Sequence, residues 1–237
     1  MPSFFLSLGF LLLLEARLLA YPGSYWPLVM TPFLIAAGCW FAFRRVNVAA
    51  IAFLFSTAVV LFLSLFPIGN FSAHIIAVFA SILFFAFIYS AKKRKHDPIV
   101  LFSFVIFLAL AFLFLTARFF LHFPLWTALS GMFFASFILF FFSHTAALEL
   151  GFWLKFRLFC LSFVVGLLMA EFYWIFGQLP FHAVNIVFLL GIIYYTLWDI
   201  AHRYFSLQFT KRSLLMNVLI LCAGVATVLL SAQWFPN

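Results

Sequence analysis

The chain has 237 residues, of which 68% are hydrophobic and only 8% are charged, and 40 of them are phenylalanine. Soluble domains carry about 25% charged residues, so 13 basic and 5 acidic side chains are too few to cover a globule of this length. The composition excludes a soluble enzyme, a nucleic-acid-binding domain and a disordered tail, and it predicts a protein solvated mainly by lipid. Membrane topology then accounts for the formal charge of +8, and no nucleic-acid partner is required.

Nine apolar runs are about as long as a membrane-spanning helix. A hydrocarbon core about 30 Å thick requires about 20 helical residues, and a helix in lipid pairs its own backbone groups. In chain order the runs are 3–20, 26–43, 48–66, 72–90, 98–119, 124–142, 156–177, 183–200 and 214–234. The sequence therefore predicts an all-α fold, a polytopic transmembrane helix bundle of about nine spans. It forms a single domain over residues 1–237 with no extramembrane domain, and it has eight spans if the first run, which contains Glu15 and Arg17, does not cross.

The basic residues predict the orientation of the bundle. Eleven of the 13 lie in the connections that follow even-numbered runs, and only Arg17 and Arg118 lie on the other side. Because lysine and arginine accumulate on cytoplasmic loops, we expect the N-terminus inside and the C-terminus outside. All seven tryptophans lie near predicted span ends, where an indole prefers the headgroup region.

A few ionisable residues lie at membrane depth on the predicted outer side. Glu171 lies about six residues, or about 9 Å, below the outer end of its span, and Glu15, Arg17 and Arg118 lie near the outer ends of two other spans. Charge at such depth is costly and usually faces a partner or a cavity. The outer turns also carry three histidines, His74, His122 and His182.

Two interpretations of these outer residues remain open. The first is structural: ion pairs lock the first, fifth and seventh spans together, and the expected partner of Glu171 is one of the two arginines, Arg118 in preference to Arg17. The second is functional: an outward-open polar pocket binds an anionic or zwitterionic group. The expected substrate-binding residues of that pocket are Glu171, Arg118, Glu15, Arg17, Trp174 and His182.

The predicted inner side holds His144, Glu149, Asp199 and His202, residue types that can ligate a metal. Their spacings match no known metal motif, and Cys39, Cys160 and Cys222 lie within apolar runs without a CxxC spacing. Motifs of metalloproteases, serine hydrolases and P-loop proteins are also missing from the sequence. We therefore expect no metal, no cofactor and no catalytic residue.

The last third of the chain carries a loose resemblance. Its residues are 171–180 (EFYWIFGQLP), 194–199 (YYTLWD) and 210–212 (TKR), followed by a last span ending in Gln-Trp. This pattern resembles uncharacterised multi-pass membrane proteins of uncultured candidate-phyla bacteria. The resemblance implies the cytoplasmic membrane of a bacterium, and because that group has no established activity, it implies no mechanism.

These observations favour an integral membrane protein that binds or transports a small solute or lipid through the outward-facing pocket. The alternative is a non-catalytic partner subunit or scaffold of a membrane complex, in which case an oligomer or partner chain is expected. A weaker alternative is an intramembrane lipid-modifying enzyme that uses Glu171 as acid or base. The expected partners are the lipid bilayer and a small solute or lipid.

Overall fold

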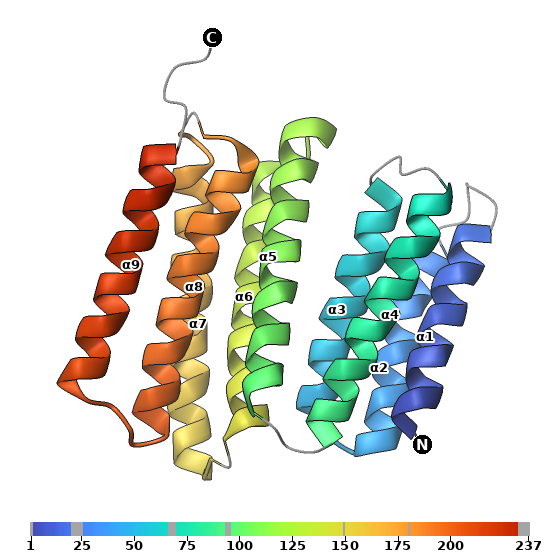
Figure 1. Cartoon of the computed structure of the whole chain (residues 1–237), viewed down its shortest axis with the longest axis horizontal. Helices are drawn as coiled ribbons and strands as arrows, with labels where there is room; N and C mark the ends of the chain where they lie inside the picture. The colour runs from blue at the N-terminus through green and yellow to red at the C-terminus, as the bar shows by residue number, and fades with distance from the viewer. Residues whose placement is uncertain are drawn as a thin grey trace. The chain divides into compact units, whose positions relative to one another are not determined.

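The computed structural model describes residues 2–19, 26–65, 70–92, 96–148, 150–179 and 181–231. These residues form nine α-helices and no strand (Figure 1). The helices are α1 (Pro2–Leu19), α2 (Trp26–Phe43), α3 (Val46–Leu65), α4 (Asn70–Lys92), α5 (His96–Leu121), α6 (Leu125–Ala147), α7 (Phe152–Phe176), α8 (Ala183–Phe205) and α9 (Lys211–Ser231). Each helix coincides with one of the nine predicted spans, so the predicted all-α helix bundle is confirmed.

The helices have the length and composition of membrane spans. Seven of them, α3 to α9, are long and apolar enough to cross a bilayer. Within the described residues, α1 and α2 contribute the shorter apolar stretches Ser3–Ala16 and Met30–Phe43. The protein is therefore a multi-pass membrane protein, and the crossing of α1 and of α2 stays a prediction.

Buried serines show how the helices accommodate polar groups in an apolar environment. The hydroxyls of Ser56, Ser103 and Ser162 each donate a hydrogen bond of 2.7–2.9 Å to the carbonyl four residues earlier in the same helix. A hydroxyl that donates to its own helix does not need a partner elsewhere. These serines therefore belong to the packing of the helices and not to a site.

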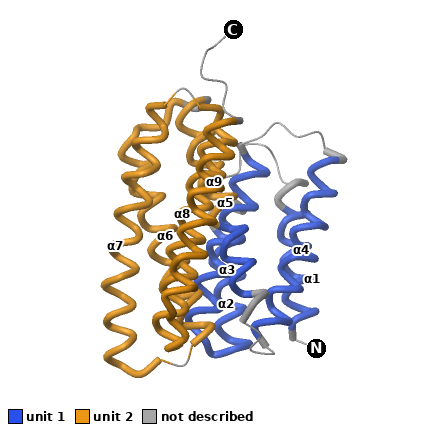
Figure 2. The backbone as a smooth tube through the Cα atoms, turned by 60° about the vertical axis from the view of Figure 1, so that its left-hand side comes forward, with its two compact units in different colours: residues 1–106 blue, residues 107–237 orange. Residues whose placement is uncertain are grey.

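The chain forms two compact units, Met1–Ile106 and Phe107–Asn237, and the boundary between them falls within α5 (Figure 2). In unit 1, phenylalanines from several helices form one aromatic core. Phe84 of α4 lies 4.9 Å from Phe10 of α1, measured between ring centroids, and Phe102 of α5 lies 4.4 Å from Phe87 and 4.7 Å from Phe55. Aromatic pairs at these distances add to the burial energy of the rings.

In unit 2, glycine allows α6 and α7 to approach closely. A Cβ atom on Gly166 of α7 would lie 3.1 Å from both the ring and the carbonyl oxygen of Phe133 in α6. Small residues at helix contacts are typical of membrane bundles, where dispersion forces between helices replace the hydrophobic effect. At the edge of the unit, α9 packs on α8, and only Asn217 and Val228 of its described side chains are buried.

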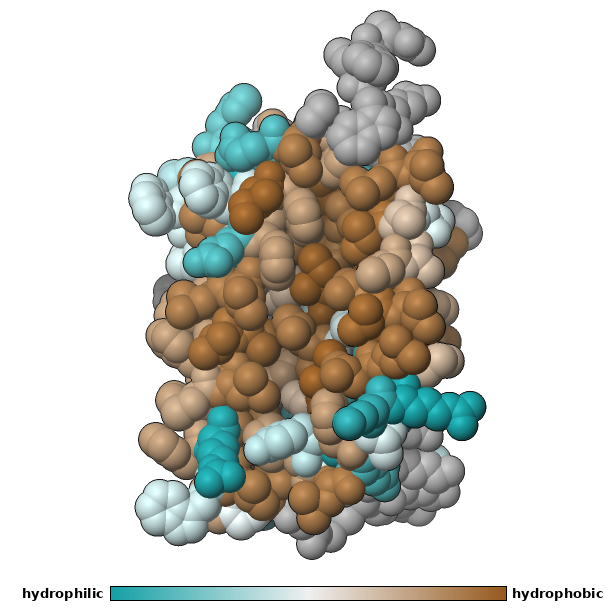
Figure 3. Space-filling view, turned by 90° about the vertical axis from the view of Figure 1, so that its left-hand side faces the viewer, coloured by the Kyte–Doolittle hydropathy of each residue, from teal (hydrophilic) through white to brown (hydrophobic). Residues whose placement is uncertain are grey.

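The surface of the molecule agrees with a bilayer environment. In the view of Figure 3, a broad hydrophobic band crosses the face, and hydrophilic residues gather above and below it. Exposed side chains of α9 such as Leu215, Leu219 and Ile220 are large and apolar. This is the distribution expected where lipid or another membrane protein covers the helices.

Candidate functional site

The predicted outer residues do not form one cluster within either unit. Glu15 of α1 pairs with His74 of α4 in unit 1, whereas Arg118, Glu171, Trp174 and His182 belong to unit 2. The side chain of Arg17 lies outside the described residues. The structure therefore brings Glu15 together with a histidine that the sequence placed only at an outer turn.

The Glu15–His74 pair is a direct contact. The Nδ1 atom of His74 lies 2.5 Å from the Oε2 atom of Glu15, and the two residues are 59 positions apart in the sequence. The glutamate side chain is 27% exposed and the histidine side chain 41% exposed. Both residues lie about one turn from a helix end, Glu15 before Leu19 and His74 after Asn70. The pair is thus accessible from the surface of unit 1.

Arg118 does not pair with Glu171 as expected. Among the described side chains it forms no salt bridge with Glu171, and its buried Nη1 atom has no hydrogen-bond partner. A Cβ atom on Gly177 would lie 2.8 Å from that Nη1 atom, so the guanidinium sits directly over the residue that caps α7. The guanidinium also lies beside the Tyr173 hydroxyl, which donates a 3.1 Å hydrogen bond to the carbonyl of Phe114.

This position is electrostatically reasonable. The last carbonyls of a helix carry a partial negative charge that attracts a cation, and the absence of a side chain at Gly177 lets the guanidinium approach. Glu171 is two residues before Tyr173. Helical residues two positions apart point in nearly opposite directions. Since Tyr173 is buried, Glu171 faces outward with Leu167 and Trp174, and all three are exposed.

His182 has a local structural role. It is exposed and occupies the N-cap of α8, where its ring nitrogen accepts a 3.4 Å hydrogen bond from the backbone N–H of Val184. The structure therefore places Arg118 and His182 at helix ends, and Glu171 and Trp174 on an outward face. It does not gather them around a described cavity.

The inner polar residues of unit 2 tie helices together. The ring nitrogens of buried His144 in α6 lie 2.8 Å from the carbonyl oxygen of Phe140 and 3.3 Å from that of Trp198 in α8. The Trp198 indole donates a 2.8 Å hydrogen bond to the Ser143 hydroxyl. These side chains bond to one another and to the backbone across the α6–α8 contact.

A second inner cluster joins α8 to α9. Asp199 accepts hydrogen bonds from Arg203, at 2.6 Å, and from Asn217, at 2.8 Å. No group of three metal-ligating residues occurs among the described side chains, and Glu149 lies outside them. The sequence reading missed Asn217, although a single amide in an otherwise apolar stretch of helix is a signal for a polar partner on the neighbouring helix.

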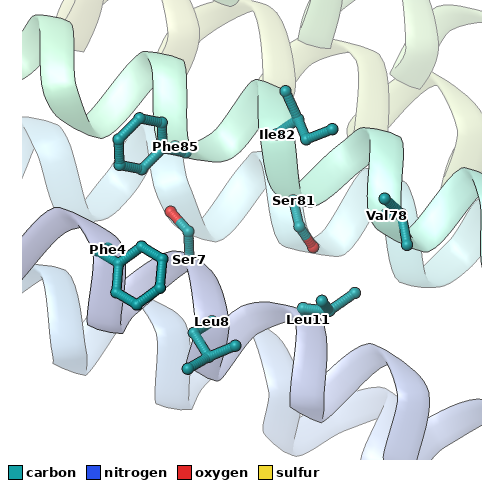
Figure 4. A pocket seen from close by; sticks show the side chains of 8 residues that line it. All are labelled: Phe4, Ser7, Leu8, Leu11, Val78, Ser81, Ile82 and Phe85. Carbon is teal, nitrogen blue, oxygen red and sulfur yellow. The ribbon is translucent and has the colours of Figure 1, made fainter.

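Cavities open on a different surface, along α1 and α4 of unit 1. One cavity of about 330 Å³ is lined by Phe4, Ser7, Leu8, Leu11, Val78, Ser81, Ile82 and Phe85 (Figure 4). A second cavity of about 340 Å³ is lined by His74, Ile75, Val78, Phe79 and Ile82. The two adjoin, because Val78 and Ile82 line both. We refer to these two sets of residues together as the α1/α4 groove.

The groove is apolar along its length and polar at one end. Its only hydroxyls, on Ser7 and Ser81, already donate to the carbonyls of Ser3 and Ala77 in their own helices, at 2.9 and 2.8 Å. His74 lines one end and contacts Glu15, whereas Phe4 and Phe85 line the other. The twelve helical residues from His74 to Phe85 extend about 16 Å, close to half of a hydrocarbon core of about 30 Å. The groove therefore extends about 16 Å along α4, and on α1 it reaches Phe4, near the N-terminal end of that helix.

A periodic pattern in the sequence underlies this groove. Phe4, Leu8, Leu11 and Glu15 recur every three or four residues along α1, and His74, Val78, Ile82 and Phe85 do so along α4. Each series therefore lies on one helix face, with an ionisable residue at the same end of the groove.

Comparison with protein families, curated proteins and solved structures finds no match to this chain.

Proposed function

We propose that this membrane protein binds a membrane lipid in the α1/α4 groove. The observation that carries the proposal is an apolar groove about 16 Å long that ends at a partly exposed carboxylate–imidazole pair. A lipid has the same order of parts, with an apolar chain below a polar headgroup. With the topology predicted from the basic residues, the polar end of the groove lies on the outer side of a bacterial cytoplasmic membrane.

The lining favours a lipid over a water-soluble solute. Sites for polar solutes present several convergent polar groups, because each group buried without a hydrogen bond costs free energy. Here the hydroxyls of Ser7 and Ser81 already donate within their own helices, and the ionisable groups lie at one end. Phe4, Val78 and Ile82 are apolar and exposed, as expected of side chains that face lipid, so an acyl chain can enter the groove laterally from the bilayer.

Filling the groove tests the proposal. Ile82 lines both cavities, and Ile82→Trp places a large side chain at a position that the two cavities share. Ile220→Trp on α9 is a matched control, since Ile220 is also an exposed isoleucine of a membrane helix. Native mass spectrometry of the protein in mild detergent counts the retained lipid. We expect Ile82→Trp to lose it and Ile220→Trp to keep it; equal retention by both variants would contradict lipid binding in the groove.

A second candidate function is that of a partner subunit in a membrane complex. The observation that favours it is α9, most of whose described side chains are exposed and, after Ser213, apolar. A photo-crosslinking residue at position 219, in native membranes, distinguishes the environments. A discrete protein adduct supports a partner subunit, and labelling of lipid alone contradicts it.

A further inference from the structure

We infer that the lipid of the α1/α4 groove is a phospholipid whose headgroup carries a primary amine, bound at Glu15 and His74. This inference rests on the proposed function and adds the chemistry of the headgroup. It follows from the hydrogen-bonding capacity of the pair, its charge and its depth.

The contact between the two side chains shows that the Nδ1 atom of His74 carries a proton. A carboxylate oxygen only accepts hydrogen bonds, so the Nδ1 atom of His74, 2.5 Å from the Oε2 atom of Glu15, is the donor. The second carboxylate oxygen and the Nε2 atom of His74 make no hydrogen bond to any described side chain. Those two atoms are available to a ligand.

Both protonation states of the imidazole select the same headgroup. If the imidazole is neutral, the pair carries one negative charge and two acceptors, which suit a primary ammonium with its three N–H donors. If it is protonated, the carboxylate still accepts from the ammonium, and the Nε2–H donates to the adjacent phosphate. Either arrangement forms charge-assisted hydrogen bonds, which are about twice as strong as neutral ones.

Other common headgroups fit less well. A quaternary ammonium has no N–H group and cannot donate to Glu15. An anionic headgroup without an amine brings its phosphate close to the carboxylate, and Glu15 and His74 are the only acidic or basic side chains described on α1 and α4. The pair therefore favours the primary amine over both.

The depth of the pair also fits a headgroup. Each residue lies four positions from the end of its helix, or about 6 Å, and both side chains are partly exposed. An amine linked to a phosphate reaches this level while the acyl chain follows Val78, Ile82 and Phe85 into the groove. One molecule thus contacts both parts of the site.

The test compares headgroups on identical acyl chains. The purified, delipidated full-length chain is titrated with phosphatidylethanolamine, its mono-, di- and trimethylated derivatives, and phosphatidylglycerol. We expect phosphatidylethanolamine to bind at least about tenfold tighter than phosphatidylcholine, a difference of ~1.4 kcal/mol. Affinity should fall with each methyl group, because each one removes a donor. This series uses the wild-type protein, so the result does not depend on a variant that folds.

Variants connect the preference to the pair. Glu15→Gln should bring phosphatidylethanolamine and phosphatidylcholine to equal affinity, whereas Glu171→Gln, the matched change at an exposed glutamate of unit 2, should keep the difference. Equal wild-type affinities, or tightest binding of phosphatidylglycerol, with all binding lost in Ile82→Trp, would overturn the headgroup inference and leave the groove intact. Lipid binding that Ile82→Trp does not alter would instead overturn the proposed function itself.

Discussion

Units 1 and 2 place their few polar side chains in different environments. In unit 1, Glu15 and His74 form a half-exposed pair at the end of a surface groove. In unit 2, Ser143, His144 and Trp198 are buried and bond across the α6–α8 contact. Buried polar groups must be satisfied within the protein, so those of unit 2 stabilise helix packing, whereas the pair in unit 1 retains atoms that a ligand can use.

The largest loss of stability should come from substitution of Trp198. Its side chain is only 5% exposed, and its ring lies against those of His144 and His202, at centroid distances of 4.7 and 4.8 Å. Trp198→Ala should lower the free energy of unfolding by about 3–5 kcal/mol, since it removes a large core side chain. Unfolding in detergent by titration with dodecyl sulfate measures this loss. Trp153→Ala, at a tryptophan that is 75% exposed, is the control and should change little.

A smaller loss of stability is expected from substitution of two buried serines of α6, and the two should differ from each other. Ser143→Ala leaves the buried Trp198 indole without its acceptor, at a cost of about 1–3 kcal/mol. Ser136→Ala removes a hydroxyl that donates only to Met132 of its own helix, so no donor is stranded and the loss should be smaller. The same unfolding titration compares them. Equal losses would show that the cross-helix bond contributes nothing beyond the hydroxyl itself.

The smallest stability effect should come from the pair in unit 1. Glu15→Gln should lower the free energy of unfolding by less than about 1 kcal/mol, because partly exposed ion pairs contribute little. A loss as large as that of Trp198→Ala would mean that the pair is structural, and the contrast between the two units would disappear. Unfolding must be measured in lipid-free detergent, because a bound lipid itself adds stability.

The spans were predictable because hydropathy reports directly on the membrane environment. The ends of the spans were less predictable from the sequence. The seventh span was expected from residue 156, whereas α7 begins at Phe152 and includes Lys155. Charged residues are excluded from an apolar run, but a long lysine side chain can extend toward water while its backbone stays helical. Chemical composition therefore located the helices, and backbone geometry determined where they end.

The candidate site was only partly predictable. The sequence indicated Glu15 and His74 as outer residues, but their contact joins α1 to α4, two helices that are not neighbours along the chain. Arg118 was expected to pair with Glu171 because the two carry opposite charges. In the structure its guanidinium lies instead at the C-terminal end of α7. The partial charges of the backbone cannot be recognised from the positions of charged residues in the sequence. Which helices pack together depends on their side-chain packing and not on their order along the chain.

The central claim is that a lipid occupies the α1/α4 groove, and site-specific labelling tests it most directly. A phosphatidylethanolamine with a diazirine in its acyl chain is incorporated with the wild-type protein into bilayers and activated by light, and the labelled peptides are mapped. We predict that labelling concentrates on residues 78–85 of α4 and 4–11 of α1, and that Ile82→Trp removes this excess. Labelling spread evenly over the exposed faces of α4, α7 and α9 would contradict the claim.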